Sequence, residues 1–257
     1  SSSQPPSILI FTEWVPGGSI RSILNNFGPL SPNVVKSYVQ QALEGLVYLH
    51  DHEIWHRDIK GANILVTDSG QIKLADFGTS EKLRNGEDHS IDGSTSGSSG
   101  IQTTCGTPLF MAPEAMLDPK TVDGLKADVW SMGSTALQML TGSPPWKEHG
   151  FQNFMQLMMY VARDDGTPHI EETLPPALRD FIGMCFRRDP LLRPSARQLL
   201  THPCFGQTSQ GLRSLRSSTV SSSLRSVTSI ISDDSSDGEG GGRGGSATRK
   251  RASARAP

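Results

Sequence analysis

The stretch HRDIKGANILVTDSGQIKLADFG, residues 56–78, decides how this chain folds. Near its centre, the aliphatic segments 64–66 and 72–74 flank the turn-forming residues Asp68-Ser69-Gly70. This pattern predicts a β-hairpin closed by an Asx-type turn. Polar side chains of the kinds that act in catalysis or bind metals stand at fixed spacing on either side of that hairpin: Asp58, Lys60, Asn63 and Asp76.

The letters HRD at 56–58, the asparagine at 63 and the letters DFG at 76–78 resemble the catalytic loop and the metal-binding turn of a protein kinase. The resemblance implies that Asp58 orients the substrate hydroxyl as its base and that Lys60 meets the transferring phosphate. Asn63 and Asp76 would offer hard oxygen ligands to Mg²⁺. Each aspartate taken singly would be an ordinary turn or loop residue, so the kinase prediction depends on the whole set.

The apolar segment 8–15, ILIFTEWV, is rich in β-branched and aromatic residues and predicts a buried strand. It resembles the hinge of a kinase, with Thr12 in the gatekeeper position. The resemblance implies that the Glu13 carbonyl and the Val15 amide bind the adenine of ATP; an ordinary core strand is the alternative. The other residues that the resemblance places around ATP are Ser19 near the ribose, Leu65 at the floor of the adenine pocket, and Lys60, Asn63 and Asp76.

Further residues match parts of a kinase that support the site and do not carry the chemistry. Met111-Ala112-Pro113-Glu114 resembles the end of an activation segment, and Arg193 would pair with Glu114, because an isolated buried charge is costly. Asp128 resembles the aspartate that ties down the backbone of the catalytic loop. The residues given a structural or regulatory role by the resemblance are His56, Arg57, Phe77, Gly78, Thr103, Thr104, Thr107, Glu114, Asp128 and Arg193.

The motifs also indicate the type of substrate. The letters HRDIKGAN resemble those of serine/threonine kinases, which have a lysine, here Lys60, after the catalytic aspartate. Tyrosine kinases usually have alanine and arginine there. Cys105-Gly106-Thr107-Pro108 resembles the serine/threonine P+1 loop, with Thr107 able to hydrogen-bond Asp58 and Lys60. This resemblance predicts a kinase that phosphorylates serine or threonine.

Within that class, the segments VPGGSI, HRDIKGANILV and DFGTS most resemble the MAP kinase kinase kinases. Membership of that group implies ATP and Mg²⁺ as cofactors and a MAP kinase kinase as the protein substrate. The letters PLF at 108–110 and Met132-Gly133-Ser134 depart from the commoner letters of the group, without touching the chemistry.

The expected fold class is α+β and protein-kinase-like, mainly the α-helical C-lobe plus the hinge strand, followed by a disordered tail. Residues 1–6 are expected to be a loop remnant, residues 7–205 a partial kinase domain, and residues 206–257 a disordered tail rich in Ser, Gly and Arg. Apolar periodicity and capping residues predict helices over 19–25, 32–50, 125–140, 151–162, 176–186 and 195–200, and the polar segment 81–104 predicts a mobile loop.

The segment before the hinge contains neither a Gly-rich phosphate loop nor the strand lysine and helix glutamate that kinases need, since only seven residues precede Ile8. We therefore expect the chain to be part of a larger kinase, with little or no activity alone. The alternative of a different class is a catalytically inactive, kinase-derived interaction module. The intact HRD, Asn63 and DFG weigh against that alternative.

Two segments suggest regulation. Thr103 and Thr104 precede the P+1 loop, where a phosphate could pair with Arg57 and order the activation segment, although a generic flexible loop is the alternative. The tail contains Arg249-Lys250-Arg251 and the acidic stretch SDDSSDGE at 232–239, which are candidate import or phosphorylation sites, although a solvated tail is the simpler interpretation.

Composition narrows the remaining possibilities. The 257 residues carry a net charge of −2, so no strong field points to nucleic acid or to a membrane surface. No apolar run reaches the length that a membrane span requires. Three cysteines are too few and too scattered for a disulfide framework or a zinc site. We expect a cytoplasmic protein, with a nuclear location possible through the basic tail.

Overall fold

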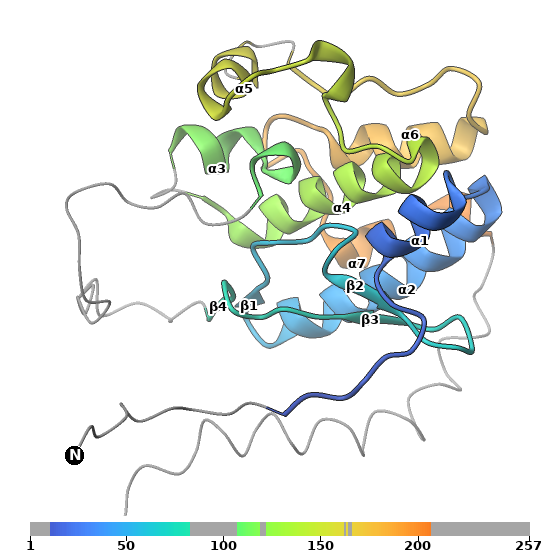
Figure 1. Cartoon of the computed structure of the whole chain (residues 1–257). Coiled ribbons are helices and arrows are strands. Elements are labelled where there is room, and N and C mark those ends of the chain that lie inside the picture. The colour runs from blue at the N-terminus through green and yellow to red at the C-terminus, as the bar shows by residue number, and fades with distance from the viewer. Residues whose placement is uncertain (1–10, 83–106, 119–121, 162, 164–165, 207–257) are drawn as a thin grey trace, which may run out of the picture. The chain divides into compact units, whose positions relative to one another are not determined.

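The computed structural model describes residues 11–82, 107–118, 122–161, 163 and 166–206 (Figure 1). All of them belong to the first of the two units into which the chain divides, Ser1–Gln207. The helices of this described part are α1 (Ile20–Phe27), α2 (Pro32–Asp51), α3 (Pro113–Leu117), α4 (Gly124–Thr141), α5 (Phe154–Val161), α6 (Pro176–Cys185) and α7 (Ala196–Leu199). The strands are β1 (Ile54–Trp55), β2 (Ile64–Val66), β3 (Ile72–Leu74) and β4 (Glu81–Lys82). The expected helix-rich, kinase-like fold is confirmed.

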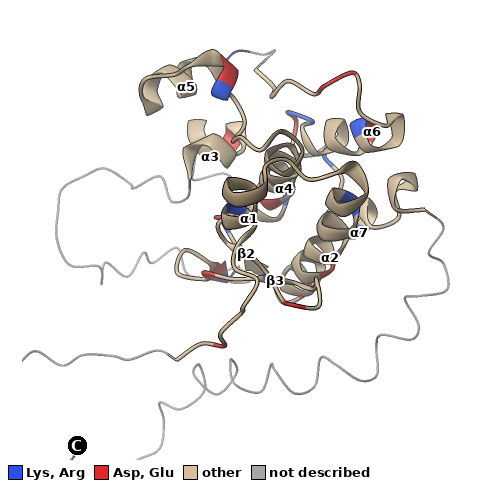
Figure 2. Ribbon diagram, turned by 45° about the vertical axis from the view of Figure 1, so that its right-hand side comes forward, with Lys and Arg blue, Asp and Glu red and all other residues tan. Residues whose placement is uncertain are grey.

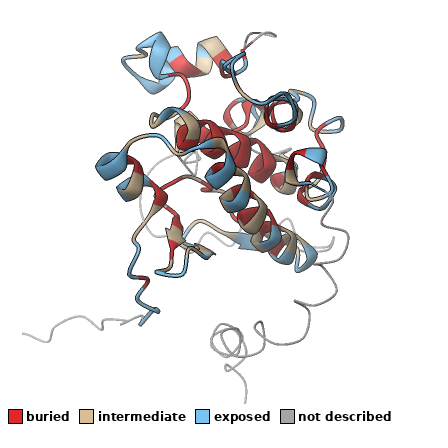
Figure 3. Cartoon of the chain, turned by 90° about the vertical axis from the view of Figure 1, so that its right-hand side faces the viewer, coloured by how far each residue is buried: buried red, intermediate tan, exposed pale blue. Residues whose placement is uncertain are grey.

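The core lies around α4, which packs against α2 and α6. Helix α4 is buried along most of its length, and Figure 3 shows buried residues concentrated in the middle of the molecule. Two of its buried hydroxyl groups donate hydrogen bonds: that of Ser131 to the Phe110 carbonyl at 2.8 Å, and that of Thr135 to the Ser131 carbonyl at 2.8 Å. Within the described ranges, no helix is long and apolar enough to cross a membrane.

Helix ends follow the capping residues in the sequence. The Ser19 hydroxyl accepts from the Ser22 amide at 3.2 Å and begins α1, and the Asp123 carboxylate accepts from two amides at the start of α4. Helix α2 begins with Pro32, and the Ser31 side chain before it makes no capping hydrogen bond. Charges of both signs are interspersed along the described part of the ribbon (Figure 2).

The hairpin β2–β3 has the expected strands, with Ile64 opposite Leu74 and Val66 opposite Ile72. The prediction of an Asx-type turn at Asp68 is wrong, because the side chain that closes the turn is that of the preceding residue, Thr67. The Thr67 hydroxyl accepts from the Gln71 amide at 3.0 Å, and Gly70 takes the left-handed conformation with φ +76°.

The strand expected over residues 8–15 is not a strand over 11–15, and residues 8–10 lie outside the described ranges. Phe11 and Trp14 are 91% and 84% exposed, while Val15 is buried. A strand needs a neighbouring strand for its backbone groups and a covered face for its side chains. In the described part, this segment meets a strand only after residue 15, where the Val66 amide of β2 donates to the Gly18 carbonyl at 2.8 Å.

The loop expected over 81–104 begins later than the sequence suggests. Glu81 and Lys82 form β4, which pairs antiparallel with β1, so that Trp55 lies opposite Glu81 and Ile54 opposite Lys82. Two polar residues give no strand pattern by themselves, and only the pairing with β1 makes them one. Residues 83–104 lie outside the described part, and so does the predicted tail after Gly206, whose boundary stays a prediction.

We expect Gly124→Ala to destabilise the fold by about 1–3 kcal/mol, because an added methyl group would overpack the core. A Cβ at Gly124 would lie 2.0 Å from Cδ2 of Trp55, so the indole would have to move. Urea unfolding measures the change. The matched control is Gly183→Ala in α6, where a Cβ has no neighbour within 4 Å and alanine favours the helix. Equal stability of the two variants would contradict the clash.

Candidate active site

The loop after β1 is fastened to α4 through the carboxylate of Asp128, which is 1% exposed. Its Oδ2 accepts from the His56 amide at 2.9 Å, and its Oδ1 accepts from the Arg57 amide at 3.0 Å. Nε2 of His50, near the end of α2, lies 3.1 Å from the same Oδ2. A buried carboxylate needs such partners, and here they fix the backbone immediately before Asp58.

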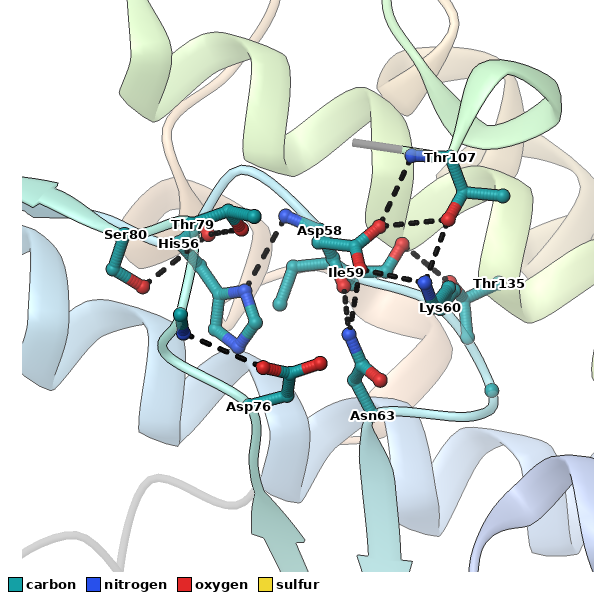
Figure 4. A network of polar contacts seen from close by, with 12 residues as sticks. His56, Asp58, Ile59, Lys60, Asn63, Asp76, Thr79, Ser80, Thr107 and Thr135 are labelled. Carbon is teal, nitrogen blue, oxygen red and sulfur yellow. Dashed lines mark hydrogen bonds and ion pairs between the residues drawn. The ribbon is translucent and has the colours of Figure 1, made fainter. Parts of the chain in front are cut away.

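Asp58 is buried at the centre of the site, and its two carboxylate oxygens have different partners (Figure 4). Oδ1 accepts from the Thr107 hydroxyl at 2.8 Å and from the Thr107 amide at 3.1 Å. Oδ2 accepts from Lys60 Nζ at 2.6 Å and from Asn63 Nδ2 at 2.9 Å. Lys60 Nζ also donates to the Thr107 hydroxyl at 2.6 Å, so the expected contacts of Thr107 with Asp58 and Lys60 are both present.

These contacts set the charge of Asp58. Burial alone would raise the pKa of its carboxyl group, because the charged form loses water. Hydrogen bonds from Lys60, Thr107 and Asn63 together with the positive charge of Lys60 outweigh burial, and the pKa of Asp58 lies below its ordinary value. Asp58 is therefore an ionised acceptor at neutral pH, as a base that receives a hydroxyl proton must be.

The hairpin brings Asn63 and Asp76 to the same end of the loop. The Ala75 amide donates to the Asn63 carbonyl at 2.9 Å, so Asp76 follows directly after the partner of Asn63. Asp76 is exposed, and the Gly78 amide is 3.4 Å from its Oδ1 (Figure 4). Because Asn63 uses Nδ2 to hold Asp58, its amide oxygen is the atom suited to a cation.

This donor set fits Mg²⁺. One carboxylate and one amide oxygen are hard ligands, and Mg²⁺ in phosphoryl-transfer sites usually takes one or two protein oxygens together with waters and substrate phosphates. The described residues hold no group of three or more His, Cys, Asp or Glu side chains suited to a metal ion. Asn63 and Asp76 stay the predicted metal ligands.

Two residues of the site have a left-handed backbone that side chains rarely adopt: Arg57 with φ +71° and Asp76 with φ +63°. Next to these residues in sequence, His56 and Phe77 are in contact, with their ring centres 5.1 Å apart. Phe77 is 48% exposed, so it packs on His56 with one side only. Residues 56 and 77 thus link the HRD and DFG segments, whose spacing the sequence had suggested.

The residues expected around the adenine and ribose of ATP are only partly assembled. Ser19 and Leu65 are joined by a β-bridge, and Val15 is buried nearby in sequence. The Glu13 carboxylate forms an ion pair of 2.6 Å with Lys73 Nζ in β3. The adenine-binding roles of Glu13 and Val15 and the roles of Ser19 and Leu65 stay predictions, and Thr12 is exposed.

The expected ion pair of Glu114 and Arg193 is present. Arg193 Nη1 donates to Glu114 Oε1 at 2.7 Å and Nη2 to Oε2 at 3.1 Å. The Arg193 side chain is 0% exposed, and its remaining N–H groups reach backbone carbonyls, among them that of Arg187 at 2.9 Å. Its guanidinium lies 5.1 Å from the centre of the Trp130 ring. This pair fixes α3, at the end of the activation segment, to the loop before α7.

Sequence reasoning missed two contacts of the site. The Gln138 side chain in α4 accepts from the Gly61 amide at 3.1 Å, and the only signal was a glutamine within an apolar helix. Glu81 Oε2 lies 2.6 Å from Arg57 Nη1, and no sequence pattern paired these two residues. Thr103 and Thr104, the predicted phosphorylation sites, lie outside the described residues, so their role stays a prediction.

Comparison with known proteins agrees with this geometry. Residues 1–205 match the model of the protein kinase domain. The chain is 44% identical to mitogen-activated protein kinase kinase kinase 3 of Arabidopsis thaliana over 77% of its own length and 28% of that protein. It is 42% identical to mitogen-activated protein kinase kinase kinase A of Dictyostelium discoideum over 76% of its length and 19% of that protein.

It is also 40% identical to cell division control protein 7 of Schizosaccharomyces pombe, over 77% of the chain and 17% of that protein. The chain thus spans less than a third of the length of each of these relatives. The match to the kinase model, in contrast, covers most of the chain and includes every described residue of the site. The chain therefore belongs to the protein kinase domain family and is similar to the MAP kinase kinase kinases within it.

Proposed function

We propose that this chain carries the catalytic loop of a protein serine/threonine kinase that transfers the γ-phosphate of ATP to a hydroxyl group of a protein. The observation that carries the proposal is the buried Asp58 carboxylate held by Lys60, Thr107 and Asn63. Phosphoryl transfer requires little covalent chemistry from the protein, and it depends on positioning and charge. This arrangement supplies both.

In the proposed reaction, Asp58 accepts a hydrogen bond from the substrate hydroxyl and then takes its proton. The hydroxyl oxygen forms a bond to the γ-phosphorus, the bond from that phosphorus to the bridging oxygen breaks, and ADP leaves with the electron pair. Lys60, 2.6 Å from Asp58, offers a positive charge to the phosphate while it moves. Mg²⁺, when bound by Asn63 and Asp76 with ATP, neutralises charge on the phosphates.

Two features favour serine and threonine over tyrosine. Lys60 follows Asp58 where tyrosine kinases usually have alanine and arginine. The Thr107 hydroxyl is hydrogen-bonded to both Asp58 and Lys60. The names of the similar proteins support a place in a MAP kinase cascade, with a MAP kinase kinase as the protein substrate. The proposal also includes ATP and Mg²⁺ as cofactors.

The test uses the natural protein that contains these residues, with radiolabelled ATP, Mg²⁺ and a MAP kinase kinase whose own catalytic aspartate has been replaced. We expect phosphoserine or phosphothreonine on the substrate. Asp76→Asn should lower kcat about 100-fold or more and raise the Mg²⁺ concentration required, because a metal ion supplies several kcal/mol of charge stabilisation.

The matched control is Asp68→Asn, the same chemical change at an exposed position in the turn of the same hairpin, which should leave the rate unchanged. Phosphotyrosine as the sole product would contradict the serine/threonine assignment. Absence of phosphoryl transfer by the wild-type protein would contradict the enzyme and favour an interaction module. An equal rate for Asp76→Asn would contradict the metal-binding role of Asp76.

A further inference from the structure

We propose that Glu81 is a positioning residue for Asp58, acting through Arg57 and providing the negative charge for which a phosphorylated activation segment would otherwise be needed. The proposal rests on the kinase activity proposed above and adds to it a regulatory property of the same site. Arg57 directly precedes Asp58, so the position of its side chain and backbone bears on the catalytic carboxylate.

The contact itself is short and direct. Glu81 Oε2 lies 2.6 Å from Arg57 Nη1. The guanidinium also lies over an aromatic face, since Arg57 Cζ is 4.8 Å from the centre of the Trp55 ring. The Arg57 amide donates to Asp128 at 3.0 Å. Side chain and backbone of Arg57 are therefore both fastened, and Glu81 is the anionic partner of the side chain.

An exposed ion pair alone contributes little, because solvent screens it and two long side chains lose freedom. Glu81 is 57% and Arg57 26% exposed, so the pair needs support from the backbone. That support is present: β4 pairs with β1 and places Glu81 directly opposite Trp55. The Ser80 hydroxyl also donates to the His56 carbonyl at 3.3 Å. The pairing of β4 with β1 therefore already positions the Glu81 carboxylate near Arg57, so the ion pair does not depend on the two side chains alone.

The charge of this partner decides what the contact can do. The sequence predicted that a phosphate on Thr103 or Thr104 would pair with Arg57 and order the activation segment. In the structure a carboxylate of the same segment already fills that role at Arg57. Glu81 therefore holds the beginning of the activation segment against the catalytic loop without any phosphate, and Asp58 keeps its position in the unphosphorylated protein.

The experiment is a double-mutant cycle in the natural protein that contains this chain, with Glu81→Gln crossed with Thr103→Ala/Thr104→Ala. Glu81→Gln should lower kcat about tenfold with the KM for ATP changed less than about twofold, because an interaction that positions the base affects the chemical step. The threonine variant alone should lose less than about threefold, and the combined variant more than the product of the two losses.

Two outcomes would overturn the proposal: an unchanged kcat in Glu81→Gln, or a loss in the threonine variant that is equally large with and without Glu81. Arg197→Met is the matched control, because it breaks another exposed ion pair of 2.6 Å, with Asp51, away from the site, and should leave kcat unchanged.

Hydrogen exchange keeps this test separate from the enzymatic proposal. Amides of residues 54–58 should exchange about tenfold faster in Glu81→Gln than in the wild type, since local opening follows the stability of the segment. If the wild-type protein transfers no phosphate, the proposed function fails, while unchanged exchange would overturn the positioning role of Glu81 by itself.

Discussion

Asp58→Asn is expected to abolish phosphoryl transfer while leaving the fold intact. General-base catalysis contributes about 10²–10⁴-fold, so kcat should fall by at least about a hundredfold. Asparagine has nearly the same shape and can still accept the 2.8 Å hydrogen bond from Thr107, but it takes no proton from a hydroxyl. The KM for ATP should hardly change, because Asp58 acts on the hydroxyl substrate.

Steady-state kinetics with Mg²⁺ and ATP measures this loss, and thermal unfolding of the same sample checks the fold. The pH dependence sharpens the test. Because the pKa of Asp58 is lowered in the folded protein, the stability that its ionised form contributes is present at neutral pH and is lost as pH falls through the folded pKa. Asp58→Asn should remove this acid-dependent component. A variant retaining half of the wild-type kcat would contradict the role of Asp58 as base.

Arg193→Met is expected to cost about 3–5 kcal/mol of folding free energy, the range found when one partner of a buried ion pair is removed. Methionine fills much of the volume, but it leaves the Glu114 carboxylate without the partner that both of its oxygens use. It also leaves the Lys126 carbonyl without the 2.8 Å hydrogen bond from Nη1. Buried groups left unpaired in this way lose water without compensation.

Urea unfolding or the melting temperature measures the effect, and a fall of about 10 °C or more is expected for a domain of this size. Arg197→Met is again the matched control, because the Arg197–Asp51 pair is exposed on both sides and should change stability far less. Adding Glu114→Gln to Arg193→Met should restore part of the loss, since it removes the unpaired charge. Equal stability of Arg193→Met and Arg197→Met would show that burial of the pair does not matter.

The local parts of the fold could be predicted because their information lies within short stretches. Apolar spacing was enough to predict α2 and α4, and two short aliphatic segments around a turn were enough to predict β2–β3. The contacts of Thr107 and the Glu114–Arg193 ion pair were predicted from the resemblance to the motifs of a family. Glu114 and Arg193 are 79 positions apart in the sequence. Periodicity alone could not have joined them.

The two wrong strand predictions share a different cause: each depended on a partner strand that the local sequence does not reveal. Residues 11–15 have the composition of a strand, yet they lack a neighbouring strand within the described part and leave Trp14 exposed. Glu81 and Lys82 lack a strand composition, yet they pair with β1. Strand formation is decided by pairing and burial more than by intrinsic preference, so both errors have one physical origin.

The left-handed backbone at Arg57 and Asp76 has a consequence for how this protein can change. Such a conformation costs about 1–3 kcal/mol at a residue with a side chain, and glycine would avoid most of it. Selection for thermal robustness alone would thus favour glycine at the two positions where the site needs a guanidinium and a carboxylate. Glycine at these two positions would stabilise the fold but remove the side chains that the site uses. Mutations that stabilise this part of the chain must therefore lie at other residues.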